Sequence, residues 1–376
     1  MYKIFIVSGE ASGDNNAAEL VRRILQKNNS IKFYGIGGKA LYEAGTKLFF
    51  EYSVLNYSGF TSVIKNYGTL RNYFKETLKI ISDLKPDLLI LVDFPGFNLK
   101  LAKVVKENFN LPIIYYISPQ LWAWHKSRIK YIKKYVDEML VIFPFEVEFY
   151  AQEGIRAKYV GNPVLSRIEN FLKNSSRKEL QTKQVTLLPG SRIGEVIHIL
   201  PTLAAVAKKL KLDNNIDFKL ITPLTTNKKE FTSIIDRELI SVEENNSKTY
   251  YQTLLNSDLV ITKFGTASLE TALLGTPLIS VYKTNYLNYL IAKSFARIQY
   301  VTLCNILARE QIVKEFIQNQ MTVENIYHEA RKILFDTDYR NNIKNRLLKV
   351  RTDLSNVKPD VNSEDIIIQY LTRAIP

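Results

Sequence analysis

The sequence predicts an α/β protein built from two Rossmann-like domains, each with a parallel sheet. Three observations lead to this fold class. Short apolar runs alternate with helix-like segments, the alternation stops at a polar stretch and then restarts, and 376 residues suffice for two buried cores. Strands spaced by helical patterns are typical of βαβ units, in which the connected strands are parallel. We therefore expect two open sheets in tandem with a central cleft between them.

In the first half, runs rich in Ile, Leu, Val and Tyr predict strands that alternate with helices. Helices are expected between the strands, for example over residues 15–27 and 99–108. The strands are expected at residues 3–8, 32–36, 88–93, 112–117 and 138–143.

The second half repeats this pattern after a break. The break covers residues 165–183, where the polar run 173–178 has the composition of a linker. Helical spacing returns over residues 364–375, as a segment that could pack back on either domain, with the N-terminal domain as the candidate. The expected strands are 185–188, 218–221, 259–261 and 277–281, and the expected domains are 1–168, 182–345 and a helical segment at 346–376.

Charge and composition narrow the class of protein. A net charge of +14 favours a polyanionic partner, either nucleic acid or anionic lipid headgroups, unless the lysines only solvate the surface. Cys304 is the single cysteine and the three histidines lie far apart, so we expect no disulfide, no metal site and no cofactor. The N-terminus is typical of a strand rather than a signal peptide, and no apolar run reaches about 18 residues. A cytoplasmic protein is expected, with any membrane contact peripheral.

Two glycine turns in the second half indicate an anion site. Each turn follows a strand and opens a helix, where free amides can bind phosphate oxygens, and Arg192 adds a planar cation. Glu270 lies about one turn into the second helix, where it can accept ribose hydroxyls; alternatively it forms a capping pair with Thr266. Two such turns with a carboxylate nearby favour a nucleoside diphosphate. The candidate residues are Gly190, Ser191, Arg192, Gly265, Thr266, Ala267 and Glu270.

The first half offers a carboxylate and a loop of small residues. Asp93 ends the apolar strand 88–92, at the carboxyl end where ligands bind in parallel sheets, so it is a candidate general base. The alternative is a helix cap or a bond within its own loop. The loop after the first strand permits close approach of a substrate to the backbone, and its candidate residues are Glu10, Ser12, Gly13 and Asp14.

Two segments suggest contact with a polyanion or a membrane. Residues 118–124 hold both tryptophans and precede a basic run, a combination that fits nucleic acid or a lipid headgroup boundary. Residues 60–78 have an apolar stripe and a basic polar face, typical either of a membrane-surface helix or of an ordinary helix facing the core. The candidate membrane contacts are Phe60, Val63, Ile64 and Tyr67.

Taken together, five segments resemble the lipid-A-disaccharide synthases, inverting glycosyltransferases with two Rossmann-like domains (the GT-B architecture). They occur in the order found in that family. The segments are Gly-Glu-Ala-Ser-Gly-Asp at 9–14, Asp-Phe-Pro-Gly-Phe-Asn at 93–98, Ser-Pro-Gln-Leu-Trp-Ala-Trp at 118–124, Leu-Pro-Gly-Ser-Arg at 188–192 and Gly-Thr-Ala-Ser-Leu-Glu at 265–270.

The resemblance implies a donor, UDP-2,3-diacylglucosamine, and an acceptor, 2,3-diacylglucosamine 1-phosphate (lipid X). The products would be the β-1′,6-linked disaccharide precursor of lipid A and UDP. Asp93 would be the base on the acceptor 6-hydroxyl and Arg192 would neutralise the departing diphosphate without a metal. Glu270 would hold the ribose and Asn305 would line the donor side. The acceptor side would comprise Glu10, Ser12, Gly13, Asp14, Ser118, Gln120 and Trp122.

The chain departs from the family pattern at two places. After Ala308 the family has glycine, a basic residue and glutamate, whereas this chain has Arg309, Glu310 and Gln311. Residues 57–60 are more polar than the family's apolar patch. The resemblance also implies contact with the anionic surface of the inner membrane and no nucleic acid, and an oligomer is compatible with the sequence. The alternatives are another GT-B enzyme acting on UDP-N-acetylglucosamine and a basic nucleic-acid-binding protein.

Overall fold

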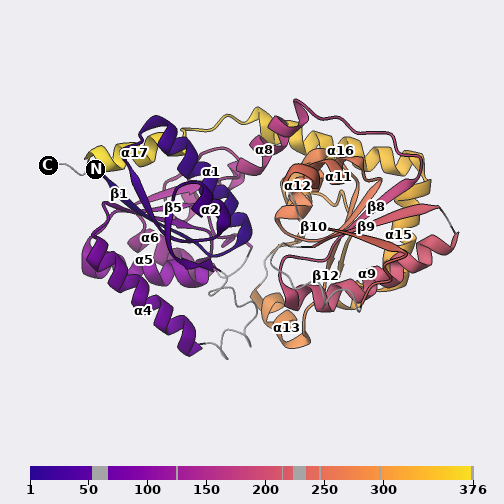
Figure 1. Cartoon of the computed structure of the whole chain (residues 1–376), viewed down its shortest axis with the longest axis horizontal. Helices are drawn as coiled ribbons and strands as arrows, with labels where there is room; N and C mark the ends of the chain where they lie inside the picture. The colour runs from indigo at the N-terminus through magenta and orange to yellow at the C-terminus, as the bar shows by residue number, and fades with distance from the viewer. Residues whose placement is uncertain are drawn as a thin grey trace. The chain divides into compact units, whose positions relative to one another are not determined.

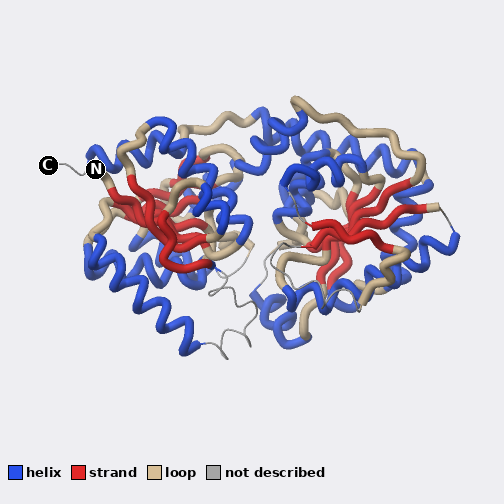
Figure 2. The backbone as a smooth tube through the Cα atoms, in the orientation of Figure 1, coloured by secondary structure: helices blue, strands red, loops and turns tan. Residues whose placement is uncertain are grey.

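The computed structural model describes residues 1–52, 67–123, 126–213, 215–222, 234–244, 247–295 and 298–373. The chain forms two compact units, Met1–Pro163 with Lys358–Pro376, and Val164–Ser294 with Ile298–Val357 (Figure 1). Each unit has a parallel β-sheet with helices packed around it (Figure 2). The predicted fold class, α/β with two Rossmann-like halves, is therefore confirmed.

The first unit contains a sheet in the order β3-β2-β1-β4-β5-β6-β7, with every neighbouring pair parallel. The chain adds β2 and β3 on one side of β1 and adds β4 to β7 on the other side, so the strand order reverses between β1 and β4. Its strands are β1 (Lys3–Ser8), β2 (Lys32–Gly37), β3 (Lys47–Glu51), β4 (Leu88–Val92), β5 (Ile113–Tyr116), β6 (Glu138–Val141) and β7 (Ala157–Tyr159). Its helices are α1 (Ala11–Lys27), α2 (Lys39–Glu43), α4 (Tyr67–Leu84), α5 (Pro95–Phe109), α6 (Ile129–Tyr135), α7 (Pro144–Gln152) and α17 (Ser363–Arg373).

The second unit repeats this plan, with the order β10-β9-β8-β11-β12-β13 and all neighbouring pairs parallel. The order reverses between β8 and β11. Its strands are β8 (Lys183–Leu188), β9 (Ile216–Thr222), β10 (Ile240–Glu244), β11 (Leu259–Lys263), β12 (Leu278–Tyr282) and β13 (Glu315–Ile317). Its helices are α8 (Pro163–Leu172), α9 (Ile193–Asp213), α11 (Ser247–Asn256), α12 (Thr266–Leu274), α13 (Tyr286–Phe295), α14 (Leu303–Ala308), α15 (Val323–Phe335) and α16 (Thr337–Asn356).

The central strands are apolar along their whole length because helices cover both faces of each sheet. All five residues of β4, Leu-Leu-Ile-Leu-Val, are completely buried. All nine strands expected from the sequence are present, with ends shifted by a few residues. The expected linker is shorter than its predicted range, because α8 runs through to Leu172 before the irregular polar stretch begins.

The C-terminal helix returns to the first unit. Helical spacing over residues 364–375 predicted a helix there, and α17 confirms it. Ile366, Ile367 and Leu371 are buried, and α17 packs against α1 (Figure 1). Lys27 of α1 lies 2.7 Å from Asp365 and 3.3 Å from Glu364, so an ion cluster joins the two helices.

The predicted amphipathic helix over 60–78 is only partly within the described structure. Phe60, Val63 and Ile64 lie outside the described residues, as does the side chain of Tyr67, where α4 begins. Further along, Leu70, Phe74 and Leu78 pack against the core of the first unit, so this half of the stripe belongs to an ordinary core-facing helix. Among the described residues, no helix combines the length and apolar composition needed to span a bilayer.

Candidate active site

The two glycine turns of the second unit lie side by side at its switch point, the place where the strand order reverses. They follow β8 and β11, which pair in parallel with Thr262 opposite Leu188. Gly190 has φ +128° and Gly265 has φ +137°, conformations that L side chains rarely adopt. In open α/β sheets, ligands bind outside the carboxyl ends of the strands at such a point.

The second turn leads directly into α12. Thr266 is the first helical residue and Gly265 is the N-cap. The Ser268 hydroxyl accepts a hydrogen bond from the Gly265 amide (3.2 Å) and donates one to the Gly265 carbonyl (2.7 Å). The alternative in which Thr266 caps the helix with Glu270 is therefore not realised. The half-buried start of α12 presents amides and the positive end of a helix dipole.

Glu270 is held by two tyrosines from α11. Tyr250 donates a hydrogen bond to Oε2 (3.0 Å) and Tyr251 donates one to Oε1 (2.9 Å). Burial raises the pKa of the Glu270 carboxyl, while the charge of Arg167 and the two hydroxyls oppose that rise. Each carboxylate oxygen has a second lone pair. The group can therefore accept a ligand hydroxyl without losing its tyrosines.

Charged side chains surround the first turn. Glu195, in the first turn of α9, receives Lys263 Nζ at 2.8 Å and Arg192 Nη1 at 3.4 Å on the same oxygen, Oε1. A Cβ at Gly190 would lie 2.7 Å from Glu195 Oε2, so only glycine leaves room for this carboxylate. The structure thus brings Gly190 and Arg192 together with two residues, Glu195 and Lys263, that the sequence did not single out for the site.

The loops after β1 and β4 meet at the switch point of the first unit. A Cβ at Gly9 would lie 2.2 Å from the Phe94 ring, and one at Gly13 would lie 2.8 Å from Ser8 Oγ. The two glycines therefore allow this close approach. Asp93 and Phe94 have φ values of +46° and +50°, in the left-handed region that is costly for residues other than glycine.

Hydrogen bonds fix the backbone of Asp93. Its carbonyl accepts hydrogen bonds from Asn98 Nδ2 (2.8 Å) and from the Tyr115 hydroxyl (2.5 Å). The N-cap of α5 is Phe94, so Asp93 does not occupy the capping position considered as an alternative. Burial, followed by the Asp93 charge, raises the pKa of Tyr115. The half-buried Asp93 side chain is thus held at the carboxyl end of β4.

The Asp14 carboxylate is hydrogen-bonded to backbone amides of the same unit. Its Oδ1 accepts a hydrogen bond from the Gly38 amide (2.6 Å) and its Oδ2 accepts one from the Ala40 amide (3.0 Å). The side chain is buried, and burial raises the pKa of its carboxyl. Asp14 therefore orders the turn before α2, whereas Glu10 and Ser12 are only half-buried.

Trp122 is hydrogen-bonded to a buried glutamate, Glu146, which was not a candidate in the sequence analysis. Glu146, in α7, accepts hydrogen bonds from Trp122 Nε1 (3.1 Å) and from the Phe143 amide (3.0 Å). Burial raises the pKa of Glu146 to about 7. Ser118 is buried 2.7 Å from the Tyr150 hydroxyl, whereas Gln120 is exposed. The capping position of Glu146 within Pro-Phe-Glu was the available sequence signal.

Asn305 does not face a ligand space. It is completely buried; Nδ2 donates to the Val313 carbonyl and to Glu315, and Oδ1 accepts from the Ile312 and Val313 amides, all at 2.8–3.0 Å. These four hydrogen bonds use both donors and both acceptor positions of the side-chain amide. The expectation that Asn305 lines the donor side is therefore corrected: it fixes the loop after α14. Arg309, where the resemblance implied glycine, adopts φ +56° at the C-cap of that helix.

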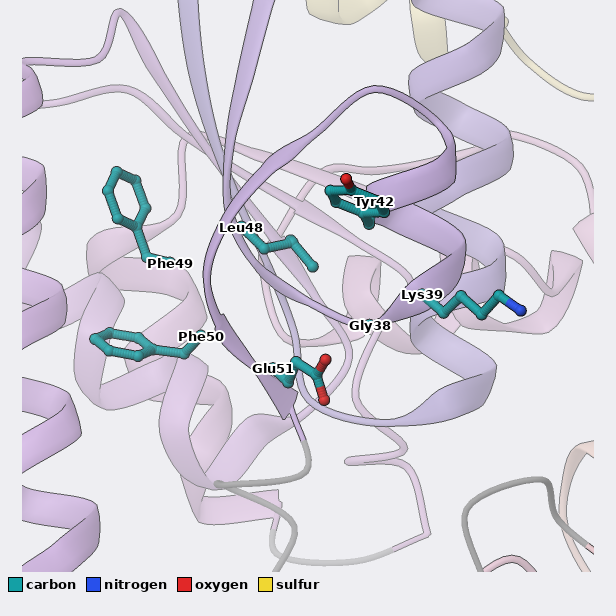
Figure 3. A pocket seen from close by; sticks show the side chains of 7 residues that line it. All are labelled: Gly38, Lys39, Tyr42, Leu48, Phe49, Phe50 and Glu51. Atoms are coloured by element: carbon teal, nitrogen blue, oxygen red, sulfur yellow. The ribbon is translucent and has the colours of Figure 1, made fainter.

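A surface pocket of about 460 Å³ lies beside the edge strand of the first sheet. Figure 3 shows its side chains coming from α2 and from β3. The lining residues are Gly38, Lys39, Tyr42, Leu48, Phe49, Phe50 and Glu51. None of them was a sequence candidate, and the pocket touches the predicted site only through Gly38, which Asp14 holds. In the described part of the chain, no three His, Cys, Asp or Glu side chains are placed to hold a metal ion.

Two parallel sheets with such turns define a two-Rossmann α/β protein of the GT-B class. Solved structures share this fold at low identity. A UDP-GlcNAc 2-epimerase from Neisseria meningitidis has a TM-score of 0.66 at 13% identity, covering 99% of this chain and 100% of that chain. The calicheamicin glycosyltransferase CalG4 has a TM-score of 0.60 at 12% identity, covering 100% and 99%.

Sequence comparison gives the family. The family model described as lipid-A-disaccharide synthetase matches residues 4–366. Lipid-A-disaccharide synthase 1 of Legionella pneumophila (strain Paris) is 36% identical over 98% of this chain and 97% of that protein. The synthase of Syntrophus aciditrophicus is 37% identical over 93% of each. The chain belongs to the lipid-A-disaccharide synthase family, and it is a glycosyltransferase of lipid A biosynthesis.

Proposed function

We propose that this enzyme transfers the diacylated glucosamine of UDP-2,3-diacylglucosamine to the 6-hydroxyl of lipid X. The products are the β-1′,6-linked disaccharide and UDP. The observation that carries this proposal is the pairing of two phosphate-type turns with Arg192 at one switch point, in a chain of this family. Neither a nucleic-acid-binding role nor a structural role gives these turns a function.

The donor binds at the second unit in this proposal. The turns at Gly190–Ser191 and Gly265–Ala267 receive the diphosphate, because a helix N-terminus favours an anion and the glycines let it approach the backbone closely. Arg192 supplies a planar cation that can form two parallel hydrogen bonds to phosphate. Glu270 accepts from the ribose hydroxyls, while its tyrosines keep the carboxylate in place.

Asp93 acts as the general base in one in-line displacement. The acceptor oxygen bonds to the anomeric carbon while the bond from that carbon to the diphosphate breaks. The hydroxyl proton passes to the Asp93 carboxylate, and the released electron pair stays on the diphosphate, whose charge Arg192 stabilises. A single displacement inverts the anomeric centre. Glu10, Ser12, Gly13, Ser118, Gln120 and Trp122 form the acceptor side, with Asp14 supporting them through the turn before α2.

The enzyme reaches its lipid substrates at the anionic surface of the inner membrane, from the cytoplasm. The net charge of +14 and the exposed Arg71, Lys75 and Lys79 of α4 support attraction to anionic headgroups. Phe60, Val63, Ile64 and Tyr67 supply the apolar contact. Vesicles containing anionic lipid should sediment less of a Phe60→Glu/Ile64→Glu variant than of wild type. Leu212→Glu, at an exposed site of α9, is the control; unchanged sedimentation or loss of folding would reject the membrane contact.

An assay with purified protein, the acylated UDP-sugar and lipid X tests the reaction. Disaccharide formation should persist in the presence of chelator, and Asp93→Asn should slow it by about 100-fold or more, the usual worth of a general base. Asparagine tolerates the left-handed backbone, so the substitution removes the charge alone. Asp83→Asn, at an exposed position of α4, should remain active. Turnover of unacylated UDP-N-acetylglucosamine without turnover of the acylated donor would refute the proposal.

A further inference from the structure

Lys263 bridges the two glycine turns of the second unit. It is the last residue of β11, two positions before Gly265, yet its side chain reaches the turn after β8. Its Nζ lies 2.8 Å from Glu195 Oε1, and its Cδ would be 3.5 Å from a Cβ at Gly190. A lysine from one anion turn therefore places its ammonium beside the other.

Two cationic side chains, Arg192 and Lys263, meet at Glu195. Both cations contact the same carboxylate. All three side chains are largely buried, with exposed fractions of 10% for Glu195, 22% for Arg192 and 20% for Lys263. The second oxygen, Oε2, is buried and has no hydrogen-bond partner among the described residues. Two cationic side chains at the carboxyl ends of β8 and β11 are suited to an incoming anion.

Aromatic rings restrict where Lys263 can go. Phe264 and Tyr282 pack with ring centroids 4.5 Å apart, and Lys263 Nζ lies 5.6 Å and 5.9 Å from these two centroids. Burial raises the pKa of Tyr282, and the charge of Glu195 adds to this, so the ring belongs to the same cluster. The two rings restrict the position of the ammonium in advance, which lowers the entropy lost on binding.

We propose that Lys263 is a second cation for the donor diphosphate and acts alongside Arg192. This inference rests on the proposed function, since it requires a nucleoside-diphosphate sugar at this switch point. Glu195 holds both cations in the free enzyme, and the diphosphate becomes their partner when donor binds. As the bond to the anomeric carbon breaks, its electron pair moves onto the diphosphate oxygen. Lys263 then donates a hydrogen bond to the diphosphate and keeps its proton.

The test compares Lys263→Met and Lys263→Arg with wild type. UDP alone is the binding probe in titration calorimetry, and disaccharide formation gives kcat/KM for the donor. Lys263→Met should weaken UDP binding about ten- to 100-fold, the worth of a charge-assisted hydrogen bond, and should flatten its salt dependence. Lys263→Arg should recover most of the affinity. The control is Lys209→Met, because Lys209 also pairs with a glutamate, Glu324, and lies over the ring of Tyr327.

A folded Lys263→Met enzyme that binds UDP and turns over as wild type would overturn the proposal. If that variant does not fold, Glu195→Gln is the second test. It removes the carboxylate that competes with the diphosphate for Lys263, so UDP should bind as tightly as to wild type or more tightly. A loss of UDP binding would make Glu195 itself the ligand contact and reject the role of Lys263. Wild type that binds UDP but forms no disaccharide would refute the proposed function, while the UDP measurements would still decide the role of Lys263.

Discussion

Replacing Glu146 with glutamine should change how the stability of the first unit depends on pH. Burial raises the pKa of this carboxyl from 4.5 to about 7 in the folded protein. The folded state therefore binds the proton more tightly than the unfolded state. Stability from this group is fully present below pH 4.5 and is lost as pH rises through about 7. At roughly 1.4 kcal/mol per tenfold change in proton affinity, the loss amounts to about 3 kcal/mol.

Glutamine stays neutral, so the Glu146→Gln variant should lack this pH dependence. Urea unfolding between pH 4.5 and 8, followed by tryptophan fluorescence, measures the unfolding free energy of the first unit, because both tryptophans belong to that unit. The difference in unfolding free energy between variant and wild type should shift by about 3 kcal/mol in favour of the variant across this range. Glu148→Gln, at an exposed position of α7, should follow wild type. A constant difference at every pH would refute the assigned protonation.

Three further substitutions test the backbone and the buried amide. Arg309→Gly should raise the unfolding free energy by about 0.5–1 kcal/mol, because the residue adopts φ +56°; a lower urea midpoint would contradict this. Asn305→Ala should lower the unfolding free energy by about 2–4 kcal/mol, since Glu315 and the amides of the following loop lose buried partners; an unchanged melting temperature would exclude that role. Asp93→Gly should stabilise by up to about 1 kcal/mol while abolishing transfer, and a destabilised variant would show that the carboxylate supports folding.

The interior of both sheets could be predicted from sequence, and their edges could not. The four strands that sequence analysis missed, β3, β7, β10 and β13, are the four edge strands of the described sheets. A central strand is buried on both faces and appears as a continuous apolar run. An edge strand is half-solvated and is often short or charged, as in Lys-Leu-Phe-Phe-Glu of β3. Its pairing depends on neighbours distant in sequence.

In the candidate site, positions set by local sequence could likewise be predicted, whereas contacts with distant segments could not. The positions of Gly190, Gly265 and Asp93 could be predicted because a residue directly after a strand must lie at the carboxyl edge of a parallel sheet. The partners of Asn305 could not be found, because its hydrogen bonds depend on how the loop after α14 folds back. Lys263 was also missed: its position after β11 was visible, but its reach to Glu195 depends on the pairing of β11 with β8.

The two switch points differ in which residue types adopt positive φ. Gly190 and Gly265 adopt positive φ without strain, and a glycine without Cβ lets an anion approach the backbone closely. Asp93 and Phe94 adopt positive φ as non-glycine residues, which costs roughly 1 kcal/mol or more each and persists only where surrounding contacts fix the backbone. Asn98 and Tyr115 provide those contacts for Asp93, and the space left by Gly9 accommodates the Phe94 ring. Strain is therefore retained at Asp93, the proposed general base at the end of a strand, and is absent at the two glycine turns that are proposed to bind the diphosphate.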